Sequence, residues 1–458
     1  MPLYLDYSST TPVKNEVFEL MKRLFIEDFG NSGSRTHLHG SKAKEEVGKA
    51  REIISSIFEC EPLEVVFTSG ATESNNMAIL GLENYGKENN KNHIITSAIE
   101  HKAVLEPIQY LEKNGFEVSY LKPNKTGRIE TNQIKEALRE NTFLVSIMHV
   151  NNETGIIQPI EEIANELKNS EAFFHVDAAQ SFGKLNTPLL NKRIDMISIS
   201  GHKIYGPKGI GALITRDRDY KRLPLKPILH GGGQERGLRP GTLPVPLVAG
   251  LGLAAKLMSD NKNWWNDCKK IKDEVLESFS HLDININGDQ EFCMPHILNI
   301  SFKEYDSEAL IVMIKNDLSV SNGSACTSSS YEPSHVLKAM DLDDNISDTL
   351  NFSAYERDNK IPKQKTYSAI TIKSNAFSIN EELAKKAVPY NSRKSSGNIF
   401  HDVTVGTIQY KNKVMPKIKN SLLNGVIWFL IGLRLSWFAL DLVFNWIMYF
   451  LGLKILMV

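Results

Sequence analysis

The chain has 458 residues, and its 53 lysines and arginines nearly balance its 54 aspartates and glutamates. The length predicts a large domain, a smaller domain and room for an extra segment. The neutral balance and the lack of a long basic run in the first 350 residues argue against nucleic-acid binding driven by bulk charge. Small-molecule chemistry is the better expectation.

Short apolar runs alternate with helical stretches through the first 250 residues. Runs rich in Val, Ile and Phe predict strands at residues 64–70, 93–101, 116–121, 142–150, 172–180, 195–203 and 210–214. Helical patterns between them cover residues 131–141 and 160–170. This alternation predicts an α/β fold with a mostly parallel, covered sheet.

The second half of the chain begins with a mainly helical pattern at residues 245–280. A strand pattern at 295–302 and a helix pattern at 307–317 follow, and they predict a smaller α/β domain. We expect a large domain over residues 1–250 and a small domain over 251–357, to which N-terminal residues contribute.

The composition changes after residue 357. Residues 358–420 are polar and rich in lysine, and residues 421–458 are strongly apolar. Arg434 and Asp441 interrupt the apolar tail, so it has no charge-free run of the usual ~20 residues. Membrane attachment, a buried tail and a tail from a changed reading frame or a fusion all remain open.

The four cysteines are Cys60, Cys268, Cys293 and Cys326. They are widely spaced, without Cys-x-x-Cys pairs and without a secretory signal at the start. This pattern predicts thiols in a reducing compartment, here the cytoplasm, and predicts no metal site.

The stretch TSGATESNN, residues 68–76, places a turn between a predicted strand and a predicted helix. Exposed N–H groups and hydroxyls at a helix N-terminus favour a phosphate. Taken alone, an ordinary N-cap explains the same residues.

Asp177 lies at the end of an apolar strand in HVDAAQSFG, with Gln180 three residues later. A buried carboxylate needs a cationic partner, and a protonated pyridine nitrogen would serve. The alternative is an aspartate that caps the next turn.

Lys203 lies in SGHKIYGPKGIGAL, after Ser200 and His202 and before three glycines. Glycines allow the backbone to approach closely, and a partly desolvated lysine becomes a nucleophilic amine. A phosphate cradle, a strand-end aspartate and such a lysine together are the groups that pyridoxal phosphate requires.

Eight motifs in this order carry a family resemblance. They are YLDYSSTTPV, TSGATESNN, EHKAVL, NNETG, HVDAAQSFGK, SGHKIYGPKGIGAL, GGGQERGLRPGT and SNGSACTSSSYEPSHVL. Over residues 3 to 353 the chain closely resembles group I cysteine desulfurases of the NifS/IscS type, in the class V aminotransferase superfamily. The resemblance implies the fold type I of pyridoxal phosphate enzymes, similar to aspartate aminotransferase, with a seven-stranded sheet.

The resemblance also implies site roles. Lys203 would bind pyridoxal phosphate, Asp177 would pair with the ring nitrogen and Gln180 would donate to a ring oxygen. His101 would stack on the ring and assist proton transfer, its alternative being a hydrogen-bonded core histidine. The remaining matching positions are Ala71, Thr72, Ser200 and His202 for the phosphate, Asn152 for cofactor and substrate, and Thr242 for the phosphate of a neighbouring subunit in a homodimer.

Cys326 lies in a run of small polar residues that does not pack a core. A buried, inert thiol is the usual alternative for a lone cysteine, but this context argues against burial. By resemblance, the Cys326 thiolate attacks the sulfur of L-cysteine, and an enzyme persulfide and L-alanine form. The sulfur then passes to an acceptor protein, either an iron–sulfur scaffold or an enzyme of nucleic-acid thiolation or phosphorothioation.

The family pattern Arg-Phe-Ser-x-Gly-Arg is altered here. The stretch that begins at Asn351 holds Glu356 where the substrate-binding arginine is expected, and Arg357 follows one residue late. In a strand this shift reverses the facing unless a bulge restores it. Substrate carboxylate binding by Arg357 is therefore an open expectation.

Three rival functions remain open. A selenocysteine lyase and a small aminotransferase share the fold, although the Cys326 segment argues against the aminotransferase. A weakly active, membrane-tethered sulfur-transfer or scaffold protein is the rival that is not primarily an enzyme.

Overall fold

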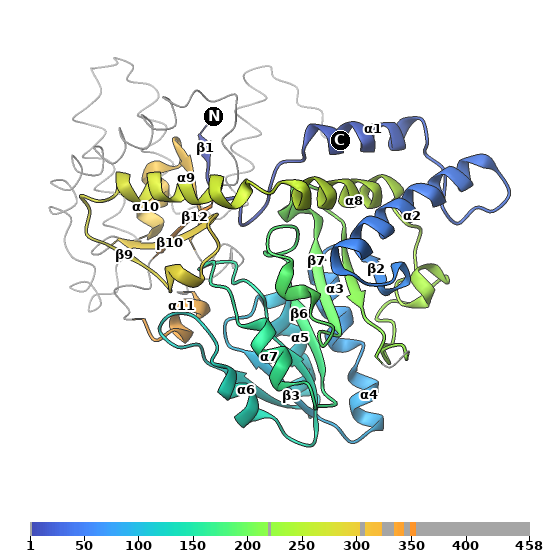
Figure 1. Ribbon diagram of the computed structural model, residues 1–458, viewed down its shortest axis with the longest axis horizontal. Helices are drawn as coiled ribbons and strands as arrows, with labels where there is room; N and C mark the ends of the chain where they lie inside the picture. The colour runs from blue at the N-terminus through green and yellow to red at the C-terminus, as the bar shows by residue number, and fades with distance from the viewer. Residues whose placement is uncertain (1, 219–220, 303–306, 323–333, 343–348, 354–458) are drawn as a thin grey trace, which may run out of the picture. The chain divides into compact units, whose positions relative to one another are not determined.

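The computed structural model describes residues 2–218, 221–302, 307–322, 334–342 and 349–353. Its main element is a seven-stranded sheet with the order β2-β8-β7-β6-β5-β3-β4 (Figure 1). The strands are β2 (Val65–Thr68), β3 (His93–Ser97), β4 (Glu117–Leu121), β5 (Thr142–Ser146), β6 (Phe173–Asp177), β7 (Met196–Ser200) and β8 (Gly211–Thr215). Strand β8 is antiparallel to both neighbours, and the other pairs are parallel. The predicted fold class is confirmed.

Both faces of this sheet are buried, which explains the continuous apolar runs in the sequence. Along β2, Val65 and Phe67 belong to one core cluster and Val66 to the other. This division follows from the alternation of side chains across a strand.

Helices cover the two faces in separate groups. Residues of α1 (Asn15–Ile26), α2 (Leu38–Phe58), α6 (Thr131–Ala137), α7 (Ile160–Glu166) and α8 (Val245–Asp260) join the first cluster. The second cluster includes α3 (Ala71–Leu80) and α5 (Lys102–Lys113), and the short α4 (Glu83–Glu88) follows α3. Helix α8 packs along both α1 and α2 (Figure 1).

The remaining elements form a second α/β group. A three-stranded antiparallel sheet has the order β12-β10-β9, from β9 (Ile284–Ile286), β10 (Ile297–Phe302) and β12 (Thr349–Ser353). Its helices are α9 (Trp264–Ser278), α10 (Ser307–Ile314) and α11 (His335–Ala339). Strand β1 (Leu3–Tyr4) pairs in parallel with β11 (Leu318–Ser319), so N-terminal residues reach this part of the chain. The domain boundaries themselves stay a prediction.

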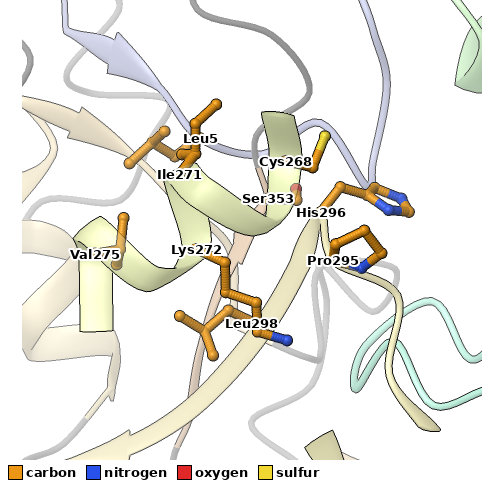
Figure 2. Close-up of a pocket in the computed structure, with 9 residues that line it drawn as sticks. All are labelled: Leu5, Cys268, Ile271, Lys272, Val275, Pro295, His296, Leu298 and Ser353. Atoms are coloured by element: carbon orange, nitrogen blue, oxygen red, sulfur yellow. The ribbon is translucent and has the colours of Figure 1, made fainter. Parts of the chain in front are cut away.

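A cavity of about 20 Å³ lies beside α9 and β10 (Figure 2). Its lining consists of Leu5, Cys268, Ile271, Lys272, Val275, Pro295, His296, Leu298 and Ser353. A space of this size holds about one water molecule. None of the predicted site residues lines it, so the site is built elsewhere.

The expectations for residues 358–420 and 421–458 lie outside the described residues. Within the described ranges, every helix is too short or too polar to span a bilayer.

Candidate active site

The first part of the site is the junction of β2 and α3. Gly70 joins them with φ 155°, a conformation that favours glycine. A Cβ on Gly211 would lie 2.7 Å from the Gly70 Cα, so β8 also requires glycine there. No side chain caps α3 at Gly70, and Ala71 and Thr72 begin the helix. Gly70 is thus the N-cap residue without a side-chain cap, and the first N–H groups of α3 suit an anion. The phosphate site stays a prediction.

Ser200 ends β7 close to this junction. A Cβ built on Gly70 would lie 3.9 Å from the Ser200 Oγ. The structure therefore brings together the strand end of Ser200 and the first turn of α3, as the predicted phosphate site requires.

Asp177 is buried at the end of β6. Its Oδ2 accepts from Asn75 Nδ2 at 2.7 Å, and its Oδ1 accepts from the Ala179 N–H at 2.9 Å. The aspartate thus caps the following turn, and it forms no ion pair within the described ranges. The turn-capping alternative is therefore confirmed by the hydrogen bond to Ala179. This hydrogen bond does not supply the cationic partner that a buried Asp177 carboxylate needs.

Two buried acceptors beside this carboxylate lack a hydrogen-bond donor among the described residues: Asn75 Oδ1 and Gln180 Oε1. The Gln180 Nε2 donates to the Ser8 carbonyl oxygen at 2.8 Å. The second hydrogen of this Nε2 amide group stays available for donation to a cofactor ring oxygen. Unsatisfied buried polar atoms are costly, and a polar ligand is one explanation for them.

Lys203 ends a short helical turn, Gly201–Lys203, directly after β7. Its Nζ donates to the Ser8 carbonyl oxygen. The N-terminal segment also binds this turn. The Thr11 N–H and hydroxyl both donate to the His202 carbonyl oxygen at 2.9 Å. The half-buried Lys203 amine is thus a held amine and not a solvated surface charge.

Two histidines of the predicted site, His202 and His101, have lowered pKa values. Burial and nearby lysines lower the pKa of His202 to about 4. Burial also lowers the pKa of His101, where the charge of Asp177 raises it and that of Lys203 lowers it. The charges of Asp177 and Lys203 both act on the His101 imidazole, so the two groups lie within electrostatic reach of it.

His101 is also the N-cap residue of α5. Its Nδ1 accepts from the Ala103 N–H at 3.0 Å, so the neutral ring carries its proton on Nε2. His101 is therefore hydrogen-bonded, as its alternative predicted, and its role at the cofactor stays a prediction.

The other predicted residues divide into two groups. Asn152 is half-buried in the turn after β5, and Thr242 is exposed before α8. Cys326, Glu356 and Arg357 lie outside the described residues.

The other three cysteines are buried or partly buried. Cys268 and Cys293 are buried, and burial raises the pKa of the Cys293 thiol. Burial raises the pKa of Cys60 to about 11. Thiols with raised pKa values are poor nucleophiles, which agrees with the expectation that none of the three is catalytic.

Sequence reasoning missed four residues around the site. Asn75 supports Asp177, Ser8 supports Lys203, and Glu100 and Glu153 are buried acids next to His101 and Asn152. Each of the four lies inside one of the motifs quoted above, and that position is the only feature of the sequence that could have indicated a role at the site.

The model of the family described as aminotransferase class-V matches residues 3–356 of the chain. The chain belongs to the class V aminotransferase family. Among curated members, the cysteine desulfurase IscS of Buchnera aphidicola subsp. Baizongia pistaciae is 47% identical over 349 residues, covering 75% of this chain and 85% of that protein. The cysteine desulfurase IscS of Vibrio campbellii is 46% identical over 350 residues, covering 76% and 86%.

Solved structures of class V relatives have the same fold. The crystal structure of DndA from Streptomyces lividans matches with a TM-score of 0.67 and 48% identity, covering 75% of this chain and 97% of that one. SspA in complex with cysteine matches with a TM-score of 0.69 and 40% identity, covering 77% and 99%. The suspected resemblance is thereby confirmed at the level of the family.

Proposed function

We propose that this class V family member is a cysteine desulfurase that uses pyridoxal phosphate. It removes sulfur from L-cysteine, releases L-alanine and holds the sulfur as a persulfide on Cys326. The observation that carries the proposal is a set of contacts: Asp177 binds Asn75 in the first turns of α3, and Lys203 and Gln180 share the Ser8 carbonyl oxygen. His101 lies within electrostatic reach of Asp177 and Lys203. The IscS relatives at 46–47% identity support the choice of reaction.

The described residues fit pyridoxal phosphate. Ala71 and Thr72 offer uncapped N–H groups for the phosphate, and Ser200 lies next to their turn. The buried Asp177 carboxylate lacks a cation within the described ranges, as expected for the partner of a protonated ring nitrogen. When bound, the cofactor would act as an electron sink for charge that develops at the substrate α-carbon.

The side chains of the chain itself supply the proton transfers. The Lys203 amine would take the α-proton of L-cysteine and return a proton toward alanine. Neutral His101, with its proton on Nε2, would donate a hydrogen bond at the reacting end of the substrate. Asp177 would hold its charge near the ring nitrogen, because Asn75 and the Ala179 N–H orient both carboxylate oxygens.

Sulfur transfer is assigned to Cys326. Its thiolate would attack the substrate sulfur, the carbon–sulfur bond would break, and the carbon would take a proton to give L-alanine. Arg357, or a neighbour in the altered stretch, would bind the substrate carboxylate together with Asn152. Cys326 and Arg357 lie outside the described residues, so these roles rest on the sequence and on the family.

A homodimer is part of the proposal. Thr242 is exposed, as expected for a residue that serves a neighbouring subunit. Large apolar side chains are also exposed along α1, just after it and at the start of α2: Phe18, Phe25, Ile26, Phe29 and Leu38. Such a patch favours a protein interface over a solvated surface.

The sulfur acceptor is proposed as a protein, either an iron–sulfur scaffold or an enzyme that thiolates nucleic acid. The attacking Cys326 thiol must be reduced, which suits a reducing compartment such as the cytoplasm, because oxidising compartments convert exposed thiols to disulfides.

The test is L-alanine formation from L-cysteine by the full chain loaded with pyridoxal phosphate. We expect turnover that is lost in Lys203→Ala and in Cys326→Ser. A folded protein with lysine-bound cofactor that forms no alanine would contradict the proposal.

A further inference from the structure

The carboxylate of Glu73 closes the turn between β2 and α3. Glu73 lies in the first turn of α3, and its Oε2 accepts from the Ser69 N–H at 2.6 Å. Ser69 directly precedes Gly70, the residue at which the helix begins. The hydrogen bond therefore holds the backbone just before the N–H groups of Ala71 and Thr72, which the proposed function assigns to the cofactor phosphate.

A carboxylate at this place conflicts with a phosphate in charge. Partial burial raises the pKa of Glu73, but hydrogen bonds from Arg239 and Ser69 outweigh it and leave the pKa below its ordinary value of 4.5. Glu73 is therefore an anion at neutral pH. A phosphate bound at the start of α3 would meet this negative charge within one helical turn, and like charges at such a distance repel each other.

Arg239 supplies the opposite charge. Its Nε donates to Glu73 Oε1 at 2.8 Å, and its Nη2 donates to Oε2 at 3.3 Å. This two-point geometry is the strong form of an arginine–carboxylate pair. The side chains of Arg239 and Glu73 are only 20% and 11% exposed, so solvent ions screen the pair little. Arg239 thus neutralises the carboxylate that closes the turn.

The segment that carries Arg239 is itself fixed on β2. Glu235 accepts from the Phe67 N–H at 2.8 Å and binds Arg51 at 2.6 and 3.1 Å. Strand β2 lies at the edge of the large sheet, and Glu235 supplies an acceptor there. Glu235 and Arg236 have φ values of 47° and 59°, a costly backbone for residues other than glycine that persists only where contacts hold it.

Residues 235–239 therefore contact the β2–α3 connection on both sides of its turn. Glu235 binds Phe67 before the turn, and Arg239 binds Glu73 after it. Arg239 is thus placed by a held segment, and its charge has a defined position relative to the turn.

We propose that Glu73 and Arg239 are positioning residues for the phosphate end of pyridoxal phosphate: Glu73 closes the turn that receives the phosphate, and Arg239 cancels the charge that would repel it. This inference rests on the cofactor of the proposed function. Both residues act through the turn and its charge, not at the reacting atoms.

The test titrates the cofactor-free full chain with pyridoxal phosphate and with pyridoxal, which lacks the phosphate. Visible absorbance of the lysine-bound aldehyde gives the Kd of each. Arg239→Gln leaves the charge of Glu73 without its partner. It should raise the Kd of pyridoxal phosphate about 10- to 100-fold and leave the Kd of pyridoxal unchanged.

Variants of Glu73 separate charge from structure. Glu73→Gln still accepts from Ser69 but is uncharged, so it should bind pyridoxal phosphate about 2- to 10-fold more tightly than wild type. The Glu73→Gln, Arg239→Gln double variant has neither charge and should bind within about 3-fold of wild type. Arg139→Gln, which breaks the exposed pair with Glu117, is the matched control and should bind both aldehydes as wild type does.

Three results would overturn the inference. One is wild-type affinity of Arg239→Gln for pyridoxal phosphate. Another is an equal loss of affinity for pyridoxal. The third is a double variant as weak as Arg239→Gln, which would assign the effect to the segment that leads to Thr242 and not to the charge of Glu73.

Two further outcomes have defined readings. If Arg239→Gln does not fold, Glu73→Gln alone decides: tighter binding of pyridoxal phosphate supports the inference, and unchanged or weaker binding overturns it. A folded wild-type protein that binds neither aldehyde overturns the cofactor of the proposed function as well, and so differs from the other results.

Discussion

Lys203 and Gln180 donate hydrogen bonds to the same acceptor, the carbonyl oxygen of Ser8. Ser8 lies 172 residues before Gln180 and 195 before Lys203 in the sequence, and the N-terminal segment contacts the Lys203 turn directly after β7. The Ser8 N–H is in turn held by the Ser353 Oγ at 2.6 Å, at the end of β12. The site therefore depends on the N-terminal segment as well as on the large sheet.

Replacing Lys203 tests the role of the held amine. Lys203→Ala should abolish the visible absorbance of lysine-bound cofactor and slow alanine formation by about 10²- to 10⁴-fold, because the proton-transferring amine is lost. Lys208→Ala is the control, since Lys208 is an exposed lysine on the same glycine-rich turn. Equal activity of the two variants would remove Lys203 from the mechanism.

Replacing Asp177 separates cofactor chemistry from folding. We expect Asp177→Asn to slow turnover by about 10²- to 10³-fold, because it removes a charge aimed at the cofactor. The cofactor-free protein should melt within about 2 °C of wild type, because the Asn75 amide can turn its unsatisfied Oδ1 toward the new amide. Thermal melts with and without cofactor check this. A large loss of stability without cofactor would show that the carboxylate is mainly structural.

The two buried acids make stability depend on pH. Burial raises the folded-state pKa of Glu100 and Glu153 from 4.5 to about 8, so the folded protein binds more protons than the unfolded chain between these values. The stability that the two protonated acids contribute to the folded state is complete below pH 4.5 and is lost as the pH rises through 8. The Glu100→Gln, Glu153→Gln double variant should therefore gain stability relative to wild type as the pH rises, by up to about 1.4 kcal/mol per pH unit for each acid. The free energy of unfolding of both proteins is measured with urea from pH 5 to 8. A difference between wild type and the double variant that stays constant over this range would contradict the raised pKa values of Glu100 and Glu153.

A buried ion pair holds the segment that leads to Thr242. Arg51 binds Glu235 at 2.6 and 3.1 Å, and Glu235 also accepts from the Phe67 N–H at 2.8 Å. Arg51→Ala leaves a buried carboxylate without its cation and should lower the free energy of unfolding by about 3–5 kcal/mol. Arg139→Ala, which breaks an exposed pair with Glu117, should cost about 0–1 kcal/mol. Similar losses in the two variants would contradict the structural role of the buried pair.

The sequence predicted the strands of the large sheet, because buried parallel strands are read from local apolar runs. Element ends were less accurate: β5 stops at Ser146 rather than at residue 150, and α6 ends at Ala137 rather than at residue 141. The Arg139 N–H donates to Thr142 Oγ1 instead of continuing the helix. Such side-chain competition with the backbone has no clear periodic signal.

Family motifs identified Lys203, Asp177 and His101, but not the residues that hold them. Asn75 and Asp177 lie 102 residues apart in the sequence, and Ser334 and Glu153 lie 181 apart. Contacts of this length depend on the complete fold. The motifs contain Glu100 and Glu153 but do not show that these acids are buried, since burial is a property of the packed chain.

The most direct test of the account is the intact mass of the cofactor-loaded protein after treatment with L-cysteine. We predict that wild type gains the mass of one reducible sulfur atom, which peptide mapping assigns to Cys326, and that Lys203→Ala and Cys326→Ser gain none there. Sulfur on Cys60, Cys268 or Cys293 instead, or sulfur gained at Cys326 without Lys203, would contradict the central claim that Lys203 activates L-cysteine for attack by Cys326.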